Sequence, residues 1–393
     1  MAAALGAARA GAEVCLLEAR SRLGGTVAHA LIHTLGGLYD DRGELINNGL
    51  PVELARRLTD AGAAVGKRRL GRAWVLDVCP AAYQSVTERW LNAEPGLTVH
   101  TGTRVSRIWH GTGCVDVVET AGRWAEARID ARAVIDATGT AEVVRLLDPE
   151  LLDKDAQRAA GGLIFRLRGV EPAVREFPRN LQTVRALQRA AEEGLLPASC
   201  RKAWLDRGIH DDEVFVKLLV PIPEDWREHR GEITSEARAV QAALLAFLGR
   251  QPGFAAARVT ATGEVGIRDG GRVRGEYCLT GDDVRQGRKF IDAACRAAWP
   301  IEYWDPDEGV TLEYLPPLTC YEVPLRSLRV RGFCNLWVAG KCLSADRIAQ
   351  ASARVVGTCW AMGEAAGRAA AAGDGRPAND LTAERRDEPL PTV

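Results

Sequence analysis

The chain has 393 residues, of which 51 are basic and 52 acidic, which gives a formal net charge of −1. This length predicts two or three domains with ample chain for a hydrophobic core. Charges of both signs are mixed along the sequence, which argues against a nucleic-acid-binding or membrane-surface protein, and no apolar run is long enough to cross a bilayer. Arg9 and Glu13 interrupt the apolar start and no charged leader precedes it, so we expect a cytoplasmic protein without a secretory signal.

The first 18 residues contain the second half of a dinucleotide-binding unit. Residues 2–10 predict a small-residue helix that Gly11 ends, and residues 13–17 (EVCLL) predict a buried strand. Glu18 follows that strand, at the place where a Rossmann-type fold keeps an acid for ribose hydroxyls. A Gly-rich turn normally precedes the helix and holds phosphate against its N-terminus, but Met1 stands directly after the position of such a turn. We expect either that the gene starts upstream of Met1 or that the protein lacks this pyrophosphate cradle.

Hydrophobic periodicity and turn residues predict the remaining elements. Residues 97–136 consist of short runs separated by glycine turns, which is typical of an antiparallel meander that ends in a buried strand at 133–136. Further helices are predicted at 50–60, 83–91, 181–193, 236–248 and 358–371, and further strands at 162–168, 214–220, 265–279 and 335–339. A loop followed by a helix is expected at 281–299. Residues 374–393 are polar and contain three prolines, which predicts a flexible tail.

Ten cysteines are scattered along the chain, and no two of them are closer than eight residues. Iron–sulfur and structural zinc sites usually need a close C-x-x-C-like pair, so we expect neither a cluster nor any metal site. In a cytosolic chain this spacing predicts free thiols, several of them in the core.

Three segments carry a resemblance to one family. They are LEARSRLGGT at 17–26, GEVGIRDGGRVRGEYCLTGDDVRQGRKF at 263–290, and NLWVAGKCLSADRIAQASARVVGTCWAMGEAAGRAAA at 335–371. They resemble the FAD-dependent oxidoreductases with the glutathione-reductase-like flavoprotein fold, and the similarity spans residues 2–372. The last segment is the most specific, because strand, glycine, loop and helix follow one another there in the family's order.

The resemblance implies an α/β protein with a discontinuous, three-layer Rossmann-like domain that binds FAD and includes the β-meander. A mixed α+β substrate domain is expected as an insertion. The expected FAD-binding parts are residues 1–60, 97–155 and 318–373, the expected substrate-domain parts are residues 61–96 and 156–317, and the tail is 374–393.

By position, the resemblance also implies contacts with FAD. Glu18 and Val105 would contact the adenosine half, and Arg20 or Arg22 would lie near the adenine or the phosphates. The diphosphate, the ribityl chain and the flavin would be lined by Gly24, Gly25, Thr26, Ala137, Thr138, Gly139, Gly340, Ser344 and Asp346. The amides of Gly357 and Thr358 would open the last helix beneath the flavin ring, where the helix dipole favours the negative charge of a reduced flavin.

The chain departs from the family pattern in and near the expected active site. Family members often have His where this chain has Arg347, and Pro where it has Gly357. Gly271 replaces the first of two arginines that the family tends to pair. The family's usual groups for proton transfer and for clamping substrate are therefore not carried over.

Arginines are the first candidates for chemistry, because a flavin supplies the redox step itself and the protein adds positioning and charge. Arg268, Arg272 and Arg274 fall at alternate positions of the predicted strand 265–279, so they would share one face. Arg268 and Arg272 are candidates for gripping a carboxylate, with a solvated strand face as the alternative, and Arg274 is expected to face solvent. Arg354, just before the last helix, is a further anion-binding candidate.

Two histidines and two tyrosines are the candidates for proton transfer. His29 and His33 would share one face if their segment is helical, and an imidazole that titrates near neutral pH can act as acid or base. A structural role is the alternative for both. Tyr277 and Tyr321 are further possible proton donors.

We therefore expect an FAD-dependent dehydrogenase or oxidase that acts on a small organic acid, amine or biosynthetic intermediate. One alternative is a catalytically silent homologue that serves as a binding or scaffold subunit, which the missing turn, Arg347 and Gly271 favour. An NAD-linked dehydrogenase is the other alternative, although no second Gly-rich strand–turn–helix marks a dedicated NAD(P)H domain. No W-x-W-x-I-P-like run supports a halogenase. The electron acceptor or donor and the oligomeric state are left open, and the Ala- and Arg-rich usage is compatible with a GC-rich bacterial genome.

Overall fold

The computed structural model describes residues 1–123, 127–155 and 158–373. The helices are α1 (Ala2–Arg9), α2 (Gly25–His29), α3 (Leu50–Asp60), α4 (Pro80–Ala93), α5 (Glu142–Leu147), α6 (Arg179–Glu192), α7 (Arg230–Leu248), α8 (Gly281–Arg285), α9 (Arg347–Ala353) and α10 (Val356–Ala372). The first strands are β1 (Val14–Glu18), β2 (Thr34–Leu35), β3 (Ala64–Leu70), β4 (Ala73–Val78), β5 (Leu97–Thr101), β6 (Thr103–Gly111), β7 (Cys114–Gly122), β8 (Arg128–Asp130) and β9 (Val134–Asp136). They are followed by β10 (Gly161–Arg168), β11 (Trp204–Arg207), β12 (Val214–Val220), β13 (Arg258–Thr262), β14 (Ala293–Ala297), β15 (Ile301–Asp305), β16 (Gly309–Glu313), β17 (Tyr321–Pro324) and β18 (Leu336–Val338).

Two parallel strand pairs lead into the turns where the sequence places cofactor contacts. β1 pairs with β5, and β9 pairs with β18 so that Asp136 lies opposite Val338. Ligands of α/β folds bind outside the carboxyl ends of such strands. The turns after β1, β9 and β18 are therefore the positions to inspect for a site.

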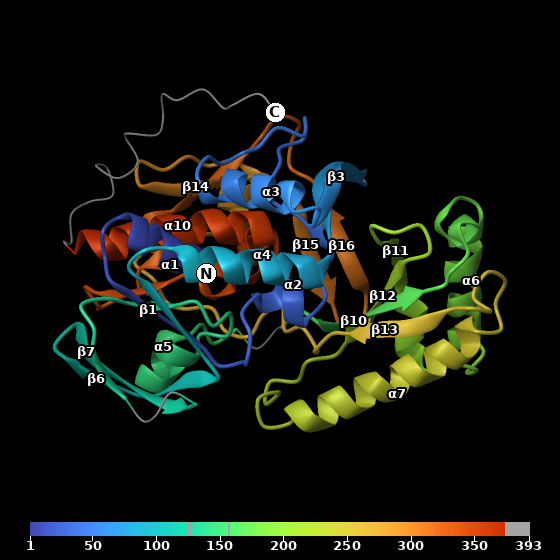
Figure 1. Cartoon of the computed structure of the whole chain (residues 1–393), viewed down its shortest axis with the longest axis horizontal. Helices are drawn as coiled ribbons and strands as arrows, with labels where there is room; N and C mark the ends of the chain where they lie inside the picture. Colours follow the sequence, from blue (N-terminus) through green and yellow to red (C-terminus); the bar gives the residue numbers. More distant parts are fainter. Residues whose placement is uncertain (124–126, 156–157, 374–393) are drawn as a thin grey trace.

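The last long helix packs against the first helix through small residues. On α10, Gly363 and Gly367 face α1, and a Cβ on Gly367 would clash with the Ala3 carbonyl oxygen and lie 2.7 Å from the Ala7 amide nitrogen. Figure 1 shows the two helices side by side in the same half of the molecule as β1 and the β6–β7 meander. Only residues without a side chain permit this approach of two backbones.

A four-stranded antiparallel sheet forms the other half. Its order is β11–β12–β10–β13, and α6 and α7 lie with it on the right of Figure 1. Its core contains the fully buried side chains of Phe165, Trp226 and Phe254. With parallel pairs and a β6–β7–β8 meander in one half and this sheet in the other, the predicted α/β class is confirmed.

Several predicted elements match the structure closely. Helix α3 spans the predicted 50–60, because Leu50, Leu54 and Leu58 recur at helical spacing and are all buried. The strands at 162–168 and 214–220 and the last helix are also confirmed within a few residues. The predicted tail, 374–393, and part of the last meander run, 124–126, lie outside the described residues.

Three predictions about local structure were wrong. Residues 97–101 are not the first strand of the meander but pair in parallel with β1. Residues 265–279 form no regular strand and make only isolated bridges, so the three arginines do not share a strand face. The segment 281–299 begins with the short helix α8 and ends in β14, instead of a loop followed by a helix.

The prediction of free thiols was wrong for two cysteines. Cys114 and Cys334 form a disulfide across 220 residues of sequence, whereas the other eight are free. Sequence spacing gave no sign of this pair, because the fold alone brings the β6–β7 turn beside the residues before β18. In the described part of the chain, no helix is long and apolar enough to cross a membrane.

Candidate active site

At the carboxyl end of β1, acids already hold both arginines that were expected near the nucleotide. Arg20 donates to Glu264 at 2.6 Å, and its backbone N–H donates to Glu18 Oε1 at 2.9 Å. Arg22 pairs with Glu88 at 2.5 Å. These arginines therefore carry little unbalanced positive charge.

The glycine turn after β1 opens α2. Gly24 is left-handed at φ 118° and Gly25 at φ 52°, and a Cβ on Gly25 would meet nothing within 4 Å. Thr26 is exposed in the first turn of the helix. The turn thus presents bare backbone at the end of β1, as the approach of a phosphate or a ring would require.

The two candidate histidines do not lie on one helix, because α2 ends at His29. His29 Nε2 lies 3.1 Å from the Arg22 carbonyl oxygen, which keeps the ring beside the turn after β1. His33 is only 1% exposed and its ring stacks on Phe215 at 3.8 Å. Its Nε2 pairs with Asp206 of β11 at 3.3 Å. His33 therefore belongs to the contact between the β2–β4–β3 sheet and the β11–β12 edge.

The surroundings of His33 keep its ring neutral. Burial first, and the nearby Lys217 next, lower the pKa of His33 from 6.5 to about 4. Arg68 bridges Asp206 at 2.9 Å and Asp77 at 2.5 Å. Although burial opposes it, Lys217 and the other cations hold the pKa of Asp206 below its usual range. The cluster is a buried network of ion pairs and hydrogen bonds that links the four strands β3, β4, β11 and β12.

We expect the protein to lose stability as the pH falls from about 6.5 to about 4, because the unfolded chain then binds a proton at His33 that the folded chain excludes. A shift of this size corresponds to a loss on the order of 3 kcal/mol in the free energy of unfolding. Urea unfolding of wild type and His33→Gln at pH 7 and pH 4.5 measures it. The free energy of unfolding of His33→Gln should change less between the two pH values than that of wild type. An equal change in the two proteins would contradict a neutral, buried His33.

The turn after β9 is organised by a buried acid. Asp136 accepts from the hydroxyl and the N–H of Thr138 and from the N–H groups of Val143 and Val144, which caps α5. Gly139 follows with φ 74°. Ala137 and Thr138 are exposed, so this turn also presents backbone at the carboxyl end of a parallel strand.

The turn after β18 brings in a lysine that the sequence analysis did not single out. Gly340 has φ 80°, and Lys341 next to it donates from Nζ to the Ile267 carbonyl oxygen at 2.6 Å. A Cβ on Gly139 would lie 2.9 Å from Lys341 Cε, so glycine at 139 makes room for the lysine. Burial lowers the pKa of Lys341.

Arg268 and Arg354 come together, although 86 positions separate them in the sequence. Burial and the neighbouring Arg354 guanidinium lower the pKa of Arg268 to about 9, and burial also lowers the pKa of Arg354. Arg268 donates to the carbonyl oxygens of Ala160 and Gly161 at 2.6 and 2.5 Å and stacks on the Trp304 ring at 4.0 Å. Two guanidinium groups therefore lie close together with little water around them.

Glu302 is an acid near both arginines, and each of its carboxylate oxygens accepts a hydrogen bond from an indole. They accept from the indole N–H groups of Trp299 at 2.8 Å and Trp304 at 2.9 Å. Arg354 Nη2 donates to the backbone oxygen of Glu302 at 2.9 Å and not to its carboxylate. Trp299 and Trp304 therefore fix the carboxylate, and among the described residues neither guanidinium has a bidentate acid.

Lys341, Arg268 and Arg354 form what we call the basic cluster. Burial raises the pKa of the Cys359 thiol, in the first turn of α10, to about 12. The positive charges of Lys341 and Arg354 act in the opposite direction on this pKa, which places both groups near the thiol. Asp269 lies near the cluster, but it pairs with Arg272 at 3.3 Å. Three basic side chains therefore lie beside the start of α10.

Arg272, the third candidate for an anion, is committed elsewhere. It is 3% exposed, pairs with Asp153 and Asp155 at 3.3 Å and donates to the Ala345 carbonyl oxygen at 3.1 Å. Asp346 caps α9 by accepting from the Ala349 amide at 2.7 Å. These ion pairs and hydrogen bonds hold the loop after β18 in place.

Two other expected cofactor residues, Val105 and Ser344, are held in place by contacts within the protein. Val105 lies in β6 opposite Thr120 of β7. Ser344 is 2% exposed and its amide donates to the Ser327 carbonyl oxygen.

The N-terminus of α10 is packed against the backbone after β2. The Gly357 amide, which was expected to face the flavin ring, donates to the Gly36 carbonyl oxygen at 2.9 Å. A Cβ on Gly37 would lie 2.8 Å from Thr358 Oγ1, so glycine is needed here. Among the described residues, Thr358 Oγ1 has no hydrogen-bond partner although the residue is fully buried.

The structure thus brings together three groups of the predicted residues. The turn after β1 forms one group, the turns after β9 and β18 form a second, and Arg268, Arg354 and the start of α10 form the third. Lys341 connects the last two groups. Its place directly after Gly340, at the end of a buried strand, is the sequence signal that would have found it.

A family model described as FAD dependent oxidoreductase matches residues 1–377. A search of curated proteins gives no match. Among solved structures, a geranylgeranyl bacteriochlorophyll reductase-like protein from Thermoplasma acidophilum is 12% identical over 98% of this chain and 76% of that chain, with a TM-score of 0.48. A flavoprotein/dehydrogenase from Cytophaga hutchinsonii is 13% identical over 70% of this chain and 65% of that chain, with a TM-score of 0.39. The anhydrotetracycline hydroxylase OxyS from Streptomyces rimosus is 16% identical over 70% of this chain and 51% of that chain, with a TM-score of 0.41.

Proposed function

Because the chain belongs to the FAD dependent oxidoreductase family and its cofactor is therefore FAD, we propose that it is a dehydrogenase or oxidase of a small organic acid. FAD, when bound, supplies the electron transfer itself. The chain's own residues bind and orient the substrate and move its proton. The observation that carries this proposal is the basic cluster beside the start of α10.

The residues present fit the cofactor. Bare backbone at Gly25 and Gly340 leaves the turns after β1 and β18 open, since a Cβ on Gly340 would come no closer than 3.8 Å to Cys359 Sγ. The Thr358 hydroxyl is buried without a partner at the start of α10. An unpaired buried hydroxyl costs on the order of 1–3 kcal/mol, which a polar atom of a bound group would recover. We propose that Glu18, Thr138, Gly340 and Thr358 are among the residues that hold FAD.

The charge of the basic cluster selects the substrate class. The lowered pKa of Arg268 reflects burial beside a second guanidinium, and a carboxylate bound between Arg268 and Arg354 would relieve the repulsion. Guanidinium groups bind carboxylates in bidentate fashion, and the described hydrogen bonds of the Glu302 carboxylate go to two indoles instead. An ammonium group would be repelled, which favours an acid over an amine.

We propose Lys341 as the group that moves a proton. Burial lowers its pKa, and a lysine with a lowered pKa can act as a base near neutral pH. Its amine lies 2.6 Å from the Ile267 carbonyl oxygen, which fixes its position between Gly139 and the start of α10. His29 stays a candidate for the same role on the other side of the site, next to the turn after β1.

The first test is reconstitution. Incubated with FAD, the purified 393-residue chain should become yellow, keep equimolar flavin after gel filtration and release FAD on denaturation. Titration with small carboxylic acids should then perturb the flavin spectrum, whereas the corresponding amides should not. A protein that stays colourless at saturating FAD would contradict the proposal. The same titration on the chain extended by the codons upstream of Met1 tests whether further residues contribute to binding.

The silent-homologue alternative has one structural observation in its favour. Glu264 and Glu88 neutralise Arg20 and Arg22, two of the cations expected beside the nucleotide. A silent homologue would bind FAD without any spectral response to acids and without turnover. The acid titration therefore separates the two functions.

A further inference from the structure

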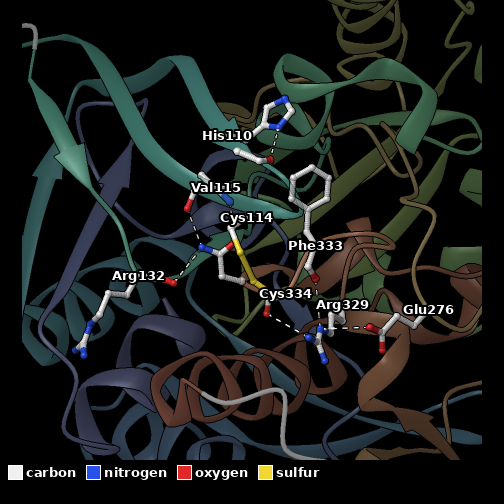
Figure 2. The surroundings of a disulfide bond; sticks show 10 residues. His110, Cys114, Val115, Arg132, Glu276, Arg329, Phe333 and Cys334 are labelled. Atoms are coloured by element: carbon white, nitrogen blue, oxygen red, sulfur yellow. Dashed lines mark hydrogen bonds and ion pairs between the residues drawn. A yellow bond between two sulfur atoms is a disulfide. The ribbon is translucent and has the colours of Figure 1, made fainter.

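The Cys114–Cys334 disulfide lies at the surface, at the amino-terminal end of β18. Figure 2 shows it joining Cys114, which follows the turn of the β6–β7 hairpin, to Cys334. Cys334 is exposed and Cys114 is half-buried. A cavity of about 390 Å³ lies beside the bond and is lined by both cysteines together with Arg329, Phe333 and Glu276. Space and exposure therefore give an external thiol access to the sulfur of Cys334.

We propose that this disulfide is a thiol-exchange site for a dithiol reductant. A thiolate of the reductant attacks Cys334 Sγ, a new sulfur–sulfur bond forms, and Cys114 leaves as a thiolate that takes a proton from water. The second thiol of the reductant then attacks its own partner sulfur in the mixed disulfide and releases Cys334 as a thiol. Two electrons pass to the cysteine pair, and the reductant ends as a disulfide.

The surroundings favour attack at Cys334. Arg329 Nη2 donates to the Cys334 carbonyl oxygen at 3.4 Å, and Nε donates to the Phe333 carbonyl oxygen at 3.4 Å, so the guanidinium stays beside the bond. Its ion pair with Glu276 at 3.3 Å lies on the wall of the same cavity. Because Glu276 balances this charge, the greater exposure of Cys334 than of Cys114 is what favours attack at its sulfur.

Hydrogen bonds hold the hairpin in place independently of the disulfide. Asn335 Oδ1 accepts from the Val115 amide at 2.8 Å, and Nδ2 donates to the carbonyl oxygens of Val115 at 2.7 Å and Arg132 at 3.1 Å. The Cys334 amide donates to the Gly113 carbonyl oxygen at 2.8 Å. Because these bonds do not involve sulfur, the two thiols stay adjacent after reduction and the disulfide can form again.

The test uses the protein purified without reductant, with dithiothreitol as the dithiol probe under native conditions, followed by alkylation and peptide mass analysis. We expect linked Cys114 and Cys334 peptides before treatment and alkylation of both cysteines after it. Incubated with oxidised glutathione, Cys114→Ser should carry glutathione on Cys334, and Cys334→Ser should react at Cys114 at least about tenfold more slowly. The control Cys278→Ser removes an exposed free thiol and should leave all of these results unchanged.

Two results would overturn the proposal. One is alkylation of both cysteines before any reductant is added, which would mean that no bond exists. The other is a linked pair that dithiothreitol reduces only after the protein is unfolded, which would make the bond purely structural. Asn335→Ala tests the positioning of the thiols, because air re-oxidation after removal of dithiothreitol should then slow about tenfold relative to wild type. Equal re-oxidation rates would refute a positioning role for Asn335.

Discussion

Replacing Arg354 by methionine should raise the KM for an organic-acid substrate about a hundredfold while leaving FAD affinity nearly unchanged. Methionine keeps an unbranched apolar stem, so the main loss is the guanidinium that would bind the substrate carboxylate. Hydrogen bonds to a charged, buried partner contribute about 1.5–3 kcal/mol, and 1.4 kcal/mol corresponds to a factor of ten. Steady-state kinetics and titration of the flavin spectrum with the acid measure the effect.

Two further variants separate recognition from general damage. Arg354→Lys keeps the charge but not the planar fork, and should recover about a tenth of the lost affinity. Arg274→Met removes an exposed arginine from the same segment as Arg268 and should leave KM unchanged. If Arg354→Met lowered kcat with an unaltered KM, the guanidinium would act on the chemical step and not on substrate binding.

The sequence predicted most of the regular structure, because these elements bury a periodic apolar pattern. Leu50, Leu54 and Leu58 define one face of α3, and small residues define the packing face of α10. The pairing partner of a strand is not encoded in its own periodicity. Residues 97–101 therefore could be recognised as a strand, whereas their parallel pairing with β1 could not.

The segment 265–279 shows why a strand-like composition was misleading. A Cβ on Gly270 would clash with the side chain of Thr140, and one on Gly275 would lie 2.7 Å from Ser344 Cβ. These glycines allow the segment to pack closely against other turns, and it forms no continuous ladder of β-sheet hydrogen bonds. As a result, Arg268 lies in the basic cluster and Arg272 pairs with three acids. The alternation of side chains along a strand would have placed both arginines on one face.

The candidate site was predictable in part for a similar reason. Turns after buried strands can be recognised along the sequence, and their expected cofactor contacts lie at the carboxyl ends of β1, β9 and β18 in the structure. The nearness of Arg268, Lys341 and Arg354 depends on three separate turns meeting in space. The resemblance to the family did not single out Lys341 either.

Replacing Gly367 by alanine should destabilise the protein by roughly 3 kcal/mol, even though alanine favours a helix over glycine by about 1 kcal/mol. The new Cβ would clash with the Ala3 carbonyl oxygen and lie 2.7 Å from the Ala7 nitrogen. Both atoms belong to the backbone of α1, so the whole helix must move away. Urea unfolding followed by circular dichroism gives the change in the free energy of unfolding.

Gly231→Ala is the matched control for this substitution. Gly231 lies in the first turn of α7, and a Cβ there would meet nothing within 4 Å. The control should therefore leave stability unchanged or raise it by up to about 1 kcal/mol, through helix propensity alone. The two variants make the same chemical change in a helix, so the difference between them measures the close packing of α1 on α10. An unfolding midpoint for Gly367→Ala equal to that of Gly231→Ala would show that α1 can move away without loss of stability. The close packing of α1 would then not fix the position of α10.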